Sequence, residues 1–327
     1  MAQEPIDESH AAQILAGTVG RDYGHSFEEH LASELRLLGT QPFRPQGRYR
    51  HLTEGWPGVE VLAFIAHSRA LSTIEQVDAW WVGGLATGAG GIRVIPGLDV
   101  AVPRSKSDVI IRIVHSVGTE EYLGVGVKTC NAAKPTNAQL YFTTASAFSA
   151  LMRDHDLPLG TEGETALKMF CGDPGLRPVD QGAVDKRLAD PDRWFWEELP
   201  SQGRAELENL FTDRQDDVTR VLLSYAYIDD PLPPTYILHQ RFRASDESQV
   251  PMAIYSVDQF VEYSSAHGGF STREYTVNKG RYKNDPGIHL APRFGFVQMQ
   301  RGGQAQHPTQ LQFNLKAGYF GHAPDHP

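Results

Sequence analysis

The chain has 327 residues, a formal net charge of −10 at pH 7 and 40% hydrophobic residues, so it can bury a large core in one enlarged domain or two small ones. It has no long apolar run and no basic-then-apolar N-terminal segment, which predicts a soluble, unexported protein of the cytoplasm. The acidic balance argues against a protein that coats nucleic acid non-specifically, and the two cysteines, Cys130 and Cys171, lack the spacing of a structural zinc site.

The first informative element is a helix predicted from Ser26 to Leu38. Ser26 and Glu29 form a capping-box pattern at its start. The apolar stripe of this helix consists of Phe27, Leu31, Leu35 and Leu38. At about 100° per residue, Glu28 falls at the edge of the stripe and faces inward. A semi-buried carboxylate needs a partner, and a metal or a basic group would serve, although a first-turn glutamate favoured by the helix dipole is the simpler interpretation.

Two more helices are predicted, over Val59–Leu71 and Ser72–Val82. The second is indicated by the helical spacing of Leu71, Ile74, Val77 and Trp81. We expect Trp80 and Trp81 to be core residues.

The stretch SKSDVIIRIVHSVGTEEYLGVGVKTCN, from Ser105 to Asn131, predicts an antiparallel hairpin that bends near Gly118. With the bend centred at Gly118, Asp108 lies across from Lys128, and directly opposed residues point to the same side of a sheet. An acid and an amine therefore meet at the open end of the predicted hairpin. The plain alternative is a cross-strand ion pair that contributes little to stability.

Alternation along the second strand places Gly124, Gly126 and Lys128 on one face, while Val125 and Val127 face a core. The two glycines are predicted to leave the polar face uncovered, so that the backbone of a ligand can come close. A carboxylate, an amine and a cleared surface suit a divalent metal that holds phosphate, because Mg²⁺ prefers carboxylate, carbonyl, water and phosphate oxygens.

Beyond the hairpin, a polar turn is predicted to lead into a helix through Leu140 and Leu151. Lys134, Asn137 and Gln139 fall at its N-terminal end, where helices favour anions, and are candidate donors to phosphate. An ordinary capped loop is an equal alternative.

From Pro234 onward the pattern changes to strands. The composition shift near Pro231 predicts a catalytic core over residues 1–230 and a β-rich recognition region over residues 231–327. One continuous domain with strands from both ends is the alternative.

The last predicted hairpin has one polar face, which consists of Gln298, Gln300, Gln310, Gln312, Asn314 and Lys316. Gln and Asn side chains bond adenine edges, and Arg301 at the turn is placed to read guanine or to bind phosphate. Two-stranded ribbons fit the major groove of DNA. A solvated face of an antiparallel sheet is the alternative, and so is a β-rich protein-interaction or carbohydrate-binding domain.

Four patches, GHSFEEHLASEL, SKSDVIIRI, GVGVKTCN and VQMQRGGQAQHPTQLQFNL, resemble type II restriction endonucleases of the PD-(D/E)XK superfamily, in particular small-site enzymes of the HpaII and MspI kind. The resemblance implies an α/β fold with a central mixed β-sheet flanked by helices. It implies a Mg²⁺-dependent, sequence-specific double-strand DNA endonuclease that leaves 5′-phosphate and 3′-hydroxyl ends. It also implies a homodimer or a monomer on double-stranded DNA, and a cognate DNA methyltransferase as a functional partner without direct contact.

By position, the resemblance makes Asp108 the metal-binding aspartate, Lys128 the motif lysine and Glu28 the helix glutamate that completes the metal site. Val127 would lend its carbonyl to the metal. The residues predicted to contact DNA are Lys106, Lys134, Asn137, Gln139, Gln298, Gln300, Arg301, Gln310, Gln312 and Lys316.

The sequence departs from the family motif at two positions. Gly126 stands where the motif usually has Asp or Glu, and Ser107 stands where it often has Pro. Either Glu28 supplies the missing carboxylate, or the site binds metal weakly, or the chain is a sequence-specific DNA-binding protein of the same fold that has lost the chemistry.

Overall fold

A computed structural model of the chain describes residues 8–47, 50–82, 91–92, 94–98, 100–102, 105–130, 137–157, 159–182, 190–226, 230–241, 250–277, 285–301 and 309–316. The chain divides into two compact units, each assembled from separate segments. Unit 1 comprises Met1–Gly17, Gln139–Val221 and Glu262–Lys316, and unit 2 comprises Thr18–Ala138, Leu222–Val261 and Ala317–Pro327. The domain boundary near Pro231 stays a prediction. None of the helices in the described ranges combines the length and apolar character that a membrane span requires.

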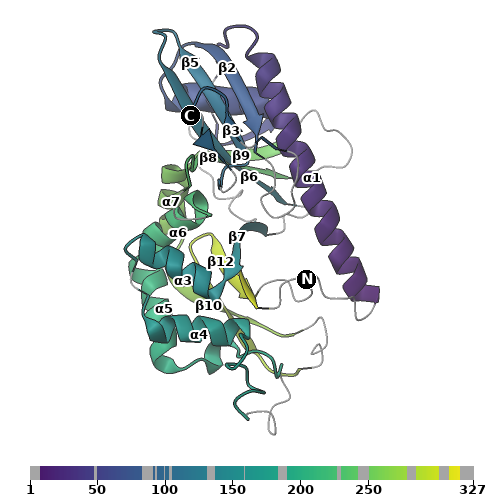
Figure 1. Cartoon of the computed structure of the whole chain (residues 1–327), viewed down its shortest axis with the longest axis vertical. Helices are drawn as coiled ribbons and strands as arrows, with labels where there is room; N and C mark the ends of the chain where they lie inside the picture. Colours follow the sequence, from purple (N-terminus) through teal and green to yellow (C-terminus); the bar gives the residue numbers. More distant parts are fainter. Residues whose placement is uncertain are drawn as a thin grey trace. The chain divides into compact units, whose positions relative to one another are not determined.

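Unit 2 is built on a mixed sheet that has six strands within the described residues. In spatial order they are β1 (Leu52–Gly55), β9 (Val250–Ser256), β8 (Pro234–Arg241), β6 (Glu120–Cys130), β5 (Val109–His115) and β2 (Ile74–Trp81) (Figure 1). β6 and β8 run parallel, and the other neighbouring pairs run antiparallel. A short ribbon of β3 (Val94–Ile95) and β4 (Val100–Ala101) accompanies this sheet.

Two helices cover the sheet of unit 2 and confirm the predicted α/β architecture. They are α1 (Glu8–Leu38) and α2 (Pro57–Ser68), the second close to its predicted range. Their buried side chains, among them Leu31, Leu35, Phe64 and Ile65, share one core with Val77, Val109, Val125 and Leu238 of the strands. Burial of this apolar surface is the main term that holds helices on the sheet.

The helix predicted from Ser26 begins much earlier. α1 runs unbroken from Glu8 to Leu38, and Ser26 lies exposed inside it, so the capping-box interpretation is wrong. Buried residues of its inner stripe are Phe27, Leu31 and Leu35, as predicted. Glu28 is only 8% exposed and faces inward, also as predicted.

The second helix predicted after α1, over Ser72–Val82, is wrong, because Ile74–Trp81 forms strand β2. The register of β2 against β5 shifts between Ile74 and Gln76, which marks a β-bulge. The extra residue of the bulge lets Ile74 and Val77, three residues apart, both be buried. A strand thereby shows the apolar spacing of a helix.

β5 and β6 form the predicted antiparallel hairpin, and Gly118 lies in the bend as expected. The N–H of His115 and the carbonyl of Thr119, 2.8 Å apart, close a loop of three residues. Gly118 has a φ of +80°, which glycine adopts without steric cost. A loop of this length centres the bend one residue earlier than predicted.

The earlier bend moves the register by two positions. Val109 pairs with Val125, so Asp108 lies opposite Gly126, and the predicted pairing of Asp108 with Lys128 is wrong. Lys128 is two residues farther along β6 on the same face, a diagonal position that a long side chain can span.

Unit 1 contains a second sheet, with five strands in the described residues. In spatial order they are β10 (Phe270–Tyr275), β11 (His289–Phe294), β12 (Val297–Arg301), β13 (Gln310–Leu315) and β7 (Ala138–Thr144). The remaining helical elements are α3 (Ala145–Asp154), α4 (Thr161–Cys171), η1 (Trp196–Glu198), α5 (Ser201–Asp213), α6 (Gln215–Ser224) and α7 (Val257–Ala266). The helix predicted through Leu140 is wrong over its first part, which is β7, and right from Ala145 onward.

Candidate active site

Asp108 stands directly before β5 on a segment that is fixed from several sides. Its backbone N–H donates to the carbonyl of Val125 at 2.9 Å, and its own carbonyl accepts the N–H of Val82 at 3.0 Å. Next to it, the hydroxyl of Ser107 donates to the carbonyl of Leu232 at 2.7 Å. These bonds hold the Asp108 backbone against the sheet, so the direction of its carboxylate is set by the fold.

The structure brings the Lys128 amine to this carboxylate. Nζ of Lys128 lies 3.2 Å from Oδ2 of Asp108 and donates to the carbonyl of Val127 at 2.9 Å. The N–H of Val127 donates to the same Oδ2 at 2.6 Å. The Lys128 and Asp108 side chains are 11% and 27% exposed, so the amine is shielded from water while a ligand can still reach the carboxylate.

Glu28 of α1 is held by two side-chain partners. Its Oε2 accepts the indole N–H of Trp81 at 3.0 Å and lies 3.3 Å from Nδ1 of His25. Burial, and then the negative charge of Asp108, raise the pKa of Glu28 above its ordinary value, while the contacts with His25 and Trp81 oppose that rise. Trp81 ends β2, and the next residue, Val82, donates its N–H to the carbonyl of Asp108 at 3.0 Å, so Glu28 and Asp108 both contact the end of this strand.

Lys106 adds a second amine to the site. Burial, and then the like charge of Lys128, lower the pKa of Lys106 to about 7, and attraction to Asp108 and Asp230 opposes the shift. The backbone N–H of Lys106 donates to Oδ2 of Asp230. An amine in this environment exchanges its proton near neutral pH.

His239 lies beside Lys128 on the neighbouring strand β8, in register with it. The side chain is fully buried, and burial, followed by the charge of Lys128, lowers the pKa of His239 to about 3. The imidazole is therefore neutral at pH 7 and adds no positive charge beside the amine.

The two glycines of β6 do not clear a surface for a ligand, contrary to the prediction. A Cβ at Gly124 would lie 2.1 Å from Oγ of Ser107 and 2.7 Å from the carbonyl oxygen of Pro233. A Cβ at Gly126 would lie 3.1 Å from Cδ1 of Ile237. Neighbouring segments of unit 2 cover both glycines, so close packing of the protein's own backbone explains Gly124.

The carboxylates at the site form a pair, Asp108 and Glu28. Among the described residues, no group of three or more His, Cys, Asp or Glu side chains is placed to hold a metal. Mg²⁺ is often bound through one or two carboxylates together with water and phosphate oxygens, so a pair is sufficient. The carbonyl of Val127, predicted to be a further ligand, accepts the Lys128 amine.

The polar face of the last hairpin is present in unit 1. In β12 and β13, Gln298 pairs with Asn314, and Gln300 pairs with Gln312. The amide of Asn314 donates to Oε1 of Gln300 at 3.3 Å. The amide of Gln312 donates to Oε1 of Gln139 at 3.3 Å, which extends the row of amides to β7. We call these five residues the amide face.

Basic residues border the amide face. Arg293 of β11 lies opposite Gln298 and therefore shares its side of the sheet. Gln310 and Lys316, at the two ends of β13, are half-buried. Burial, and then the charge of Arg293, lower the pKa of Lys316.

Arg301 does not belong to this face. It pairs with Leu311, and its side chain is only 12% exposed. Nη2 donates to the carbonyl of Trp194, Nη1 lies 3.6 Å from Oδ2 of Asp190, and the guanidinium lies 4.4 Å from the centre of the Phe195 ring. Burial of the side chain and these contacts of Nη1 and Nη2 oppose the predicted role of Arg301 in reading guanine or binding phosphate.

The remaining residues predicted to contact DNA are dispersed. Asn137 is exposed just before β7, and Gln139 is exposed on β7. Neither lies at a helix N-terminus, so the predicted anion site there is wrong. Lys134 lies outside the described residues.

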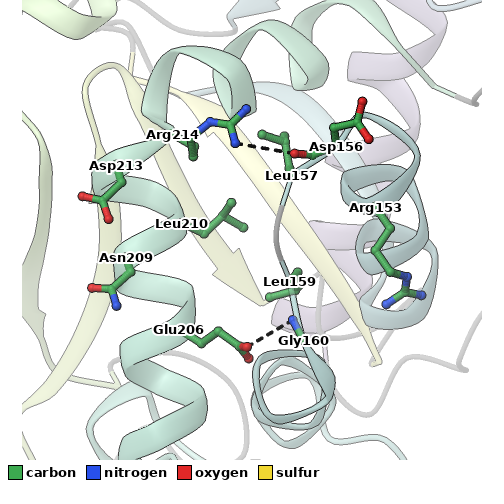
Figure 2. A pocket seen from close by; sticks show the side chains of 10 residues that line it. All are labelled: Arg153, Asp156, Leu157, Leu159, Gly160, Glu206, Asn209, Leu210, Asp213 and Arg214. Atoms are coloured by element: carbon green, nitrogen blue, oxygen red, sulfur yellow. Dashed lines mark hydrogen bonds between the residues drawn. The ribbon is translucent and has the colours of Figure 1, made fainter.

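Unit 1 also has a cavity of about 640 Å³ that does not involve the candidate residues. It is lined by Arg153, Asp156, Leu157, Leu159, Gly160, Glu206, Asn209, Leu210, Asp213 and Arg214 (Figure 2). Oε1 of Glu206 accepts the N–H of Gly160 at 3.2 Å, and Nη1 of Arg214 lies 3.5 Å from the carbonyl of Asp156. These charged groups tie the loop around Leu157 and Gly160 to its neighbours.

Three residues of the candidate site were not found from the sequence. His25 precedes Glu28 by three positions, which makes them neighbours on a helix, and this signal was available. The sequence pattern predicted Trp81 to lie in a helix, so its hydrogen bond to Glu28 could not be predicted. His239 lies in a run of strand residues, and nothing in that pattern relates it to Lys128.

No family model matches the chain, and no curated protein matches it. Among solved structures, the chain is similar to restriction endonuclease MspI in complex with its cognate DNA. The match covers 78% of this chain and 77% of that chain, with 13% sequence identity and a TM-score of 0.41.

Proposed function

We propose that the chain is a Mg²⁺-dependent, sequence-specific endonuclease that hydrolyses double-stranded DNA. The observation that supports this most is the contact of Lys128 Nζ with the Asp108 carboxylate at 3.2 Å, with Glu28 held by Trp81 at the end of β2. Two carboxylates and an amine suit hydrolysis of a phosphodiester, and the sequence resembles endonucleases at these same three positions.

Each residue has a distinct task in this proposal. Asp108 and Glu28 hold Mg²⁺, which when bound supplies a Lewis acid for the scissile phosphate. Lys128 orients the attacking water with its amine, and Lys106, two residues before Asp108, is a further amine for contact with the phosphate. The water oxygen attacks phosphorus and releases a proton to solvent, the bond from phosphorus to the 3′ oxygen breaks, and that oxygen takes a proton from solvent as it leaves. The products are a 5′-phosphate and a 3′-hydroxyl.

The amide face is the proposed surface for base contacts. Its glutamine side chains offer a donor and an acceptor side by side, the pattern that an adenine edge matches, whereas Asn314 is 3% exposed and supports Gln300 from within. The structure corrects the predicted two-stranded ribbon, because β12 and β13 are interior strands of the five-stranded sheet; the amide face would therefore meet DNA as one side of that sheet, and Arg293 and Lys316 beside it suit phosphates. A homodimer and a cognate methyltransferase remain predictions.

A second candidate function is DNA binding without cleavage. Gly126 favours it, because position 126 carries no carboxylate, and the space next to it is taken by Ile237. In that case Glu28 would fail to replace the missing acid, and the protein would bind its site without hydrolysing it.

Digestion of mixed plasmid and phage DNA by the wild-type protein, with Mg²⁺ and then with EDTA, separates the two functions. Discrete bands that appear only with Mg²⁺ are expected, and band shifts without cuts would favour the binding protein. The variant Lys128→Ala should lose cleavage and keep its affinity for DNA. Lys168→Ala is the matched control, since Lys168 also pairs with a carboxylate, Glu164 at 2.7 Å, but lies in unit 1. Cleavage by Lys128→Ala at the wild-type rate would remove Lys128 from the mechanism.

A further inference from the structure

We infer that Trp81 is a positioning residue for Glu28: its indole N–H holds the Glu28 carboxylate beside Asp108, so that the two carboxylates can share one divalent cation. The inference rests on the metal site of the proposed function. It adds to that site a residue that contacts neither metal nor DNA.

Trp81 is connected to both members of the carboxylate pair. It is the last residue of β2, and its indole N–H donates to Oε2 of Glu28 at 3.0 Å. The next residue, Val82, donates its backbone N–H to the carbonyl of Asp108 at 3.0 Å. A two-residue segment therefore binds the Glu28 side chain on one side and the Asp108 backbone on the other. The separation of the two carboxylates depends on this segment.

Glu28 needs such support because of its length and its charge. A glutamate side chain has several rotatable bonds, and fixing it costs conformational entropy unless a partner holds it. The residue is also buried, at 8% exposure, and a buried carboxylate needs hydrogen-bond donors. His25 contacts the same oxygen, Oε2, at 3.3 Å, so both contacts leave Oε1 to other partners.

Trp80 provides a matched control within the same strand. Its ring stacks on Tyr122 at 6.3 Å, and it packs against the small core of Val82 and Ile110 instead of the core that Trp81 contacts. Both tryptophans are half-buried. Replacement of either by Phe removes one indole N–H and keeps an aromatic ring, but only Trp81→Phe removes a donor to Glu28.

The test is Mn²⁺ binding measured by titration calorimetry in the absence of DNA, with Mn²⁺ as the probe for the divalent site. Loss of a residue that orients a metal ligand typically lowers metal affinity by about 10- to 100-fold. Trp81→Phe should therefore bind Mn²⁺ at least about 10-fold more weakly than the wild type, and Glu28→Ala more weakly still. Trp80→Phe should bind within about twofold of the wild type. Equal affinities for Trp81→Phe and Trp80→Phe would overturn the inference.

A second measurement uses the wild-type protein, so it does not depend on whether a variant folds. Mg²⁺ is titrated into the wild-type protein labelled with ¹⁵N at its tryptophan indoles. The inference expects the indole signal of Trp81 to move as the site fills, because its acceptor becomes a metal ligand, while the Trp80 signal stays in place. A Trp81 signal that does not respond to Mg²⁺ would contradict it.

The result is separable from the proposed nuclease function. If the wild type binds Mn²⁺ and Trp81→Phe weakens that binding, Trp81 positions Glu28 even when no DNA is cut. If the wild type cuts DNA with Mg²⁺ and Trp81→Phe keeps full Mn²⁺ affinity, the endonuclease stands and the role of Trp81 is lost.

Discussion

Replacing each of the two glycines of β6 with alanine tests whether they pack against the protein or clear a surface for a ligand. Gly124 and Gly126 are two residues apart on one strand and face the same way. Gly124→Ala would place a methyl group 2.1 Å from Oγ of Ser107 and 2.7 Å from the backbone oxygen of Pro233. Gly126→Ala would place it 3.1 Å from Cδ1 of Ile237, the mobile end of a side chain.

The expected cost of Gly124→Ala follows from these contacts. Overpacking against backbone costs about 1–3 kcal/mol in proteins. The displaced Ser107 hydroxyl also loses its hydrogen bond to the carbonyl of Leu232, worth about 1 kcal/mol. The free energy of unfolding should therefore fall by about 2–4 kcal/mol. For Gly126→Ala, the Ile237 side chain can move aside, and alanine suits a strand better than glycine, so the change should stay below about 1 kcal/mol.

Urea denaturation followed by circular dichroism measures both values, and equal slopes for the variants ensure that the comparison reports stability. A shift of about 2–4 °C in Tm per kcal/mol gives an independent reading by calorimetry. If Gly124→Ala is as stable as the wild type while DNA binding is lost, Gly124 serves ligand access, and the packing explanation fails. Equal destabilisation by both variants would also refute it.

Two further predictions concern buried charge. The pKa of His239 is lowered to about 3 from 6.5, so between these pH values the unfolded chain binds a proton that the folded chain does not, and the stability from this residue is present above about pH 6.5 and is lost as pH falls toward 3. In urea denaturation, His239→Gln should reduce the fall in the free energy of unfolding by about 1.4 kcal/mol per pH unit near pH 5. An unchanged dependence of this free energy on pH would contradict burial of the neutral ring. Arg301→Met should lower the free energy of unfolding by on the order of 3 kcal/mol, because Asp190 and the Trp194 carbonyl lose their donor. Gln312→Ala should change the free energy of unfolding by no more than about 0.5 kcal/mol and should weaken DNA binding. A stable Arg301→Met variant that no longer binds DNA would return Arg301 to the interface.

Features encoded by local pattern could be predicted from the sequence. The β5–β6 hairpin follows from two strand-forming runs around Gly118, and the bend indeed requires a residue with positive φ. The inward direction of Glu28 follows from its place on the α1 stripe, although the start of that helix was missed. Both inferences need only a period, 2 or 3.6 residues, and no knowledge of distant contacts.

Features set by distant contacts could not be predicted. The bulge in β2 gives a strand the spacing of a helix, and only pairing with β5 reveals it. Arg301 sits in a polar, glycine-rich segment that suggests exposure, yet Asp190 and Phe195, more than a hundred residues earlier, enclose it. A basic residue in a turn carries no local sign of such partners, so sequence alone favours the solvent.

The pairing of strands in the sheet explains why the second carboxylate, that of Glu28, comes from helix α1 and not from position 126 of β6. β6 pairs with β8 in parallel, and this places Ile237 against Gly126, so a carboxylate at position 126 would have to push into an apolar side chain. The Asp108 oxygen near it already accepts the Val127 N–H and the Lys128 amine. Helix α1 instead brings a carboxylate, that of Glu28, to the end of β2. The proposed metal site would therefore depend on how firmly α1 is held to β2.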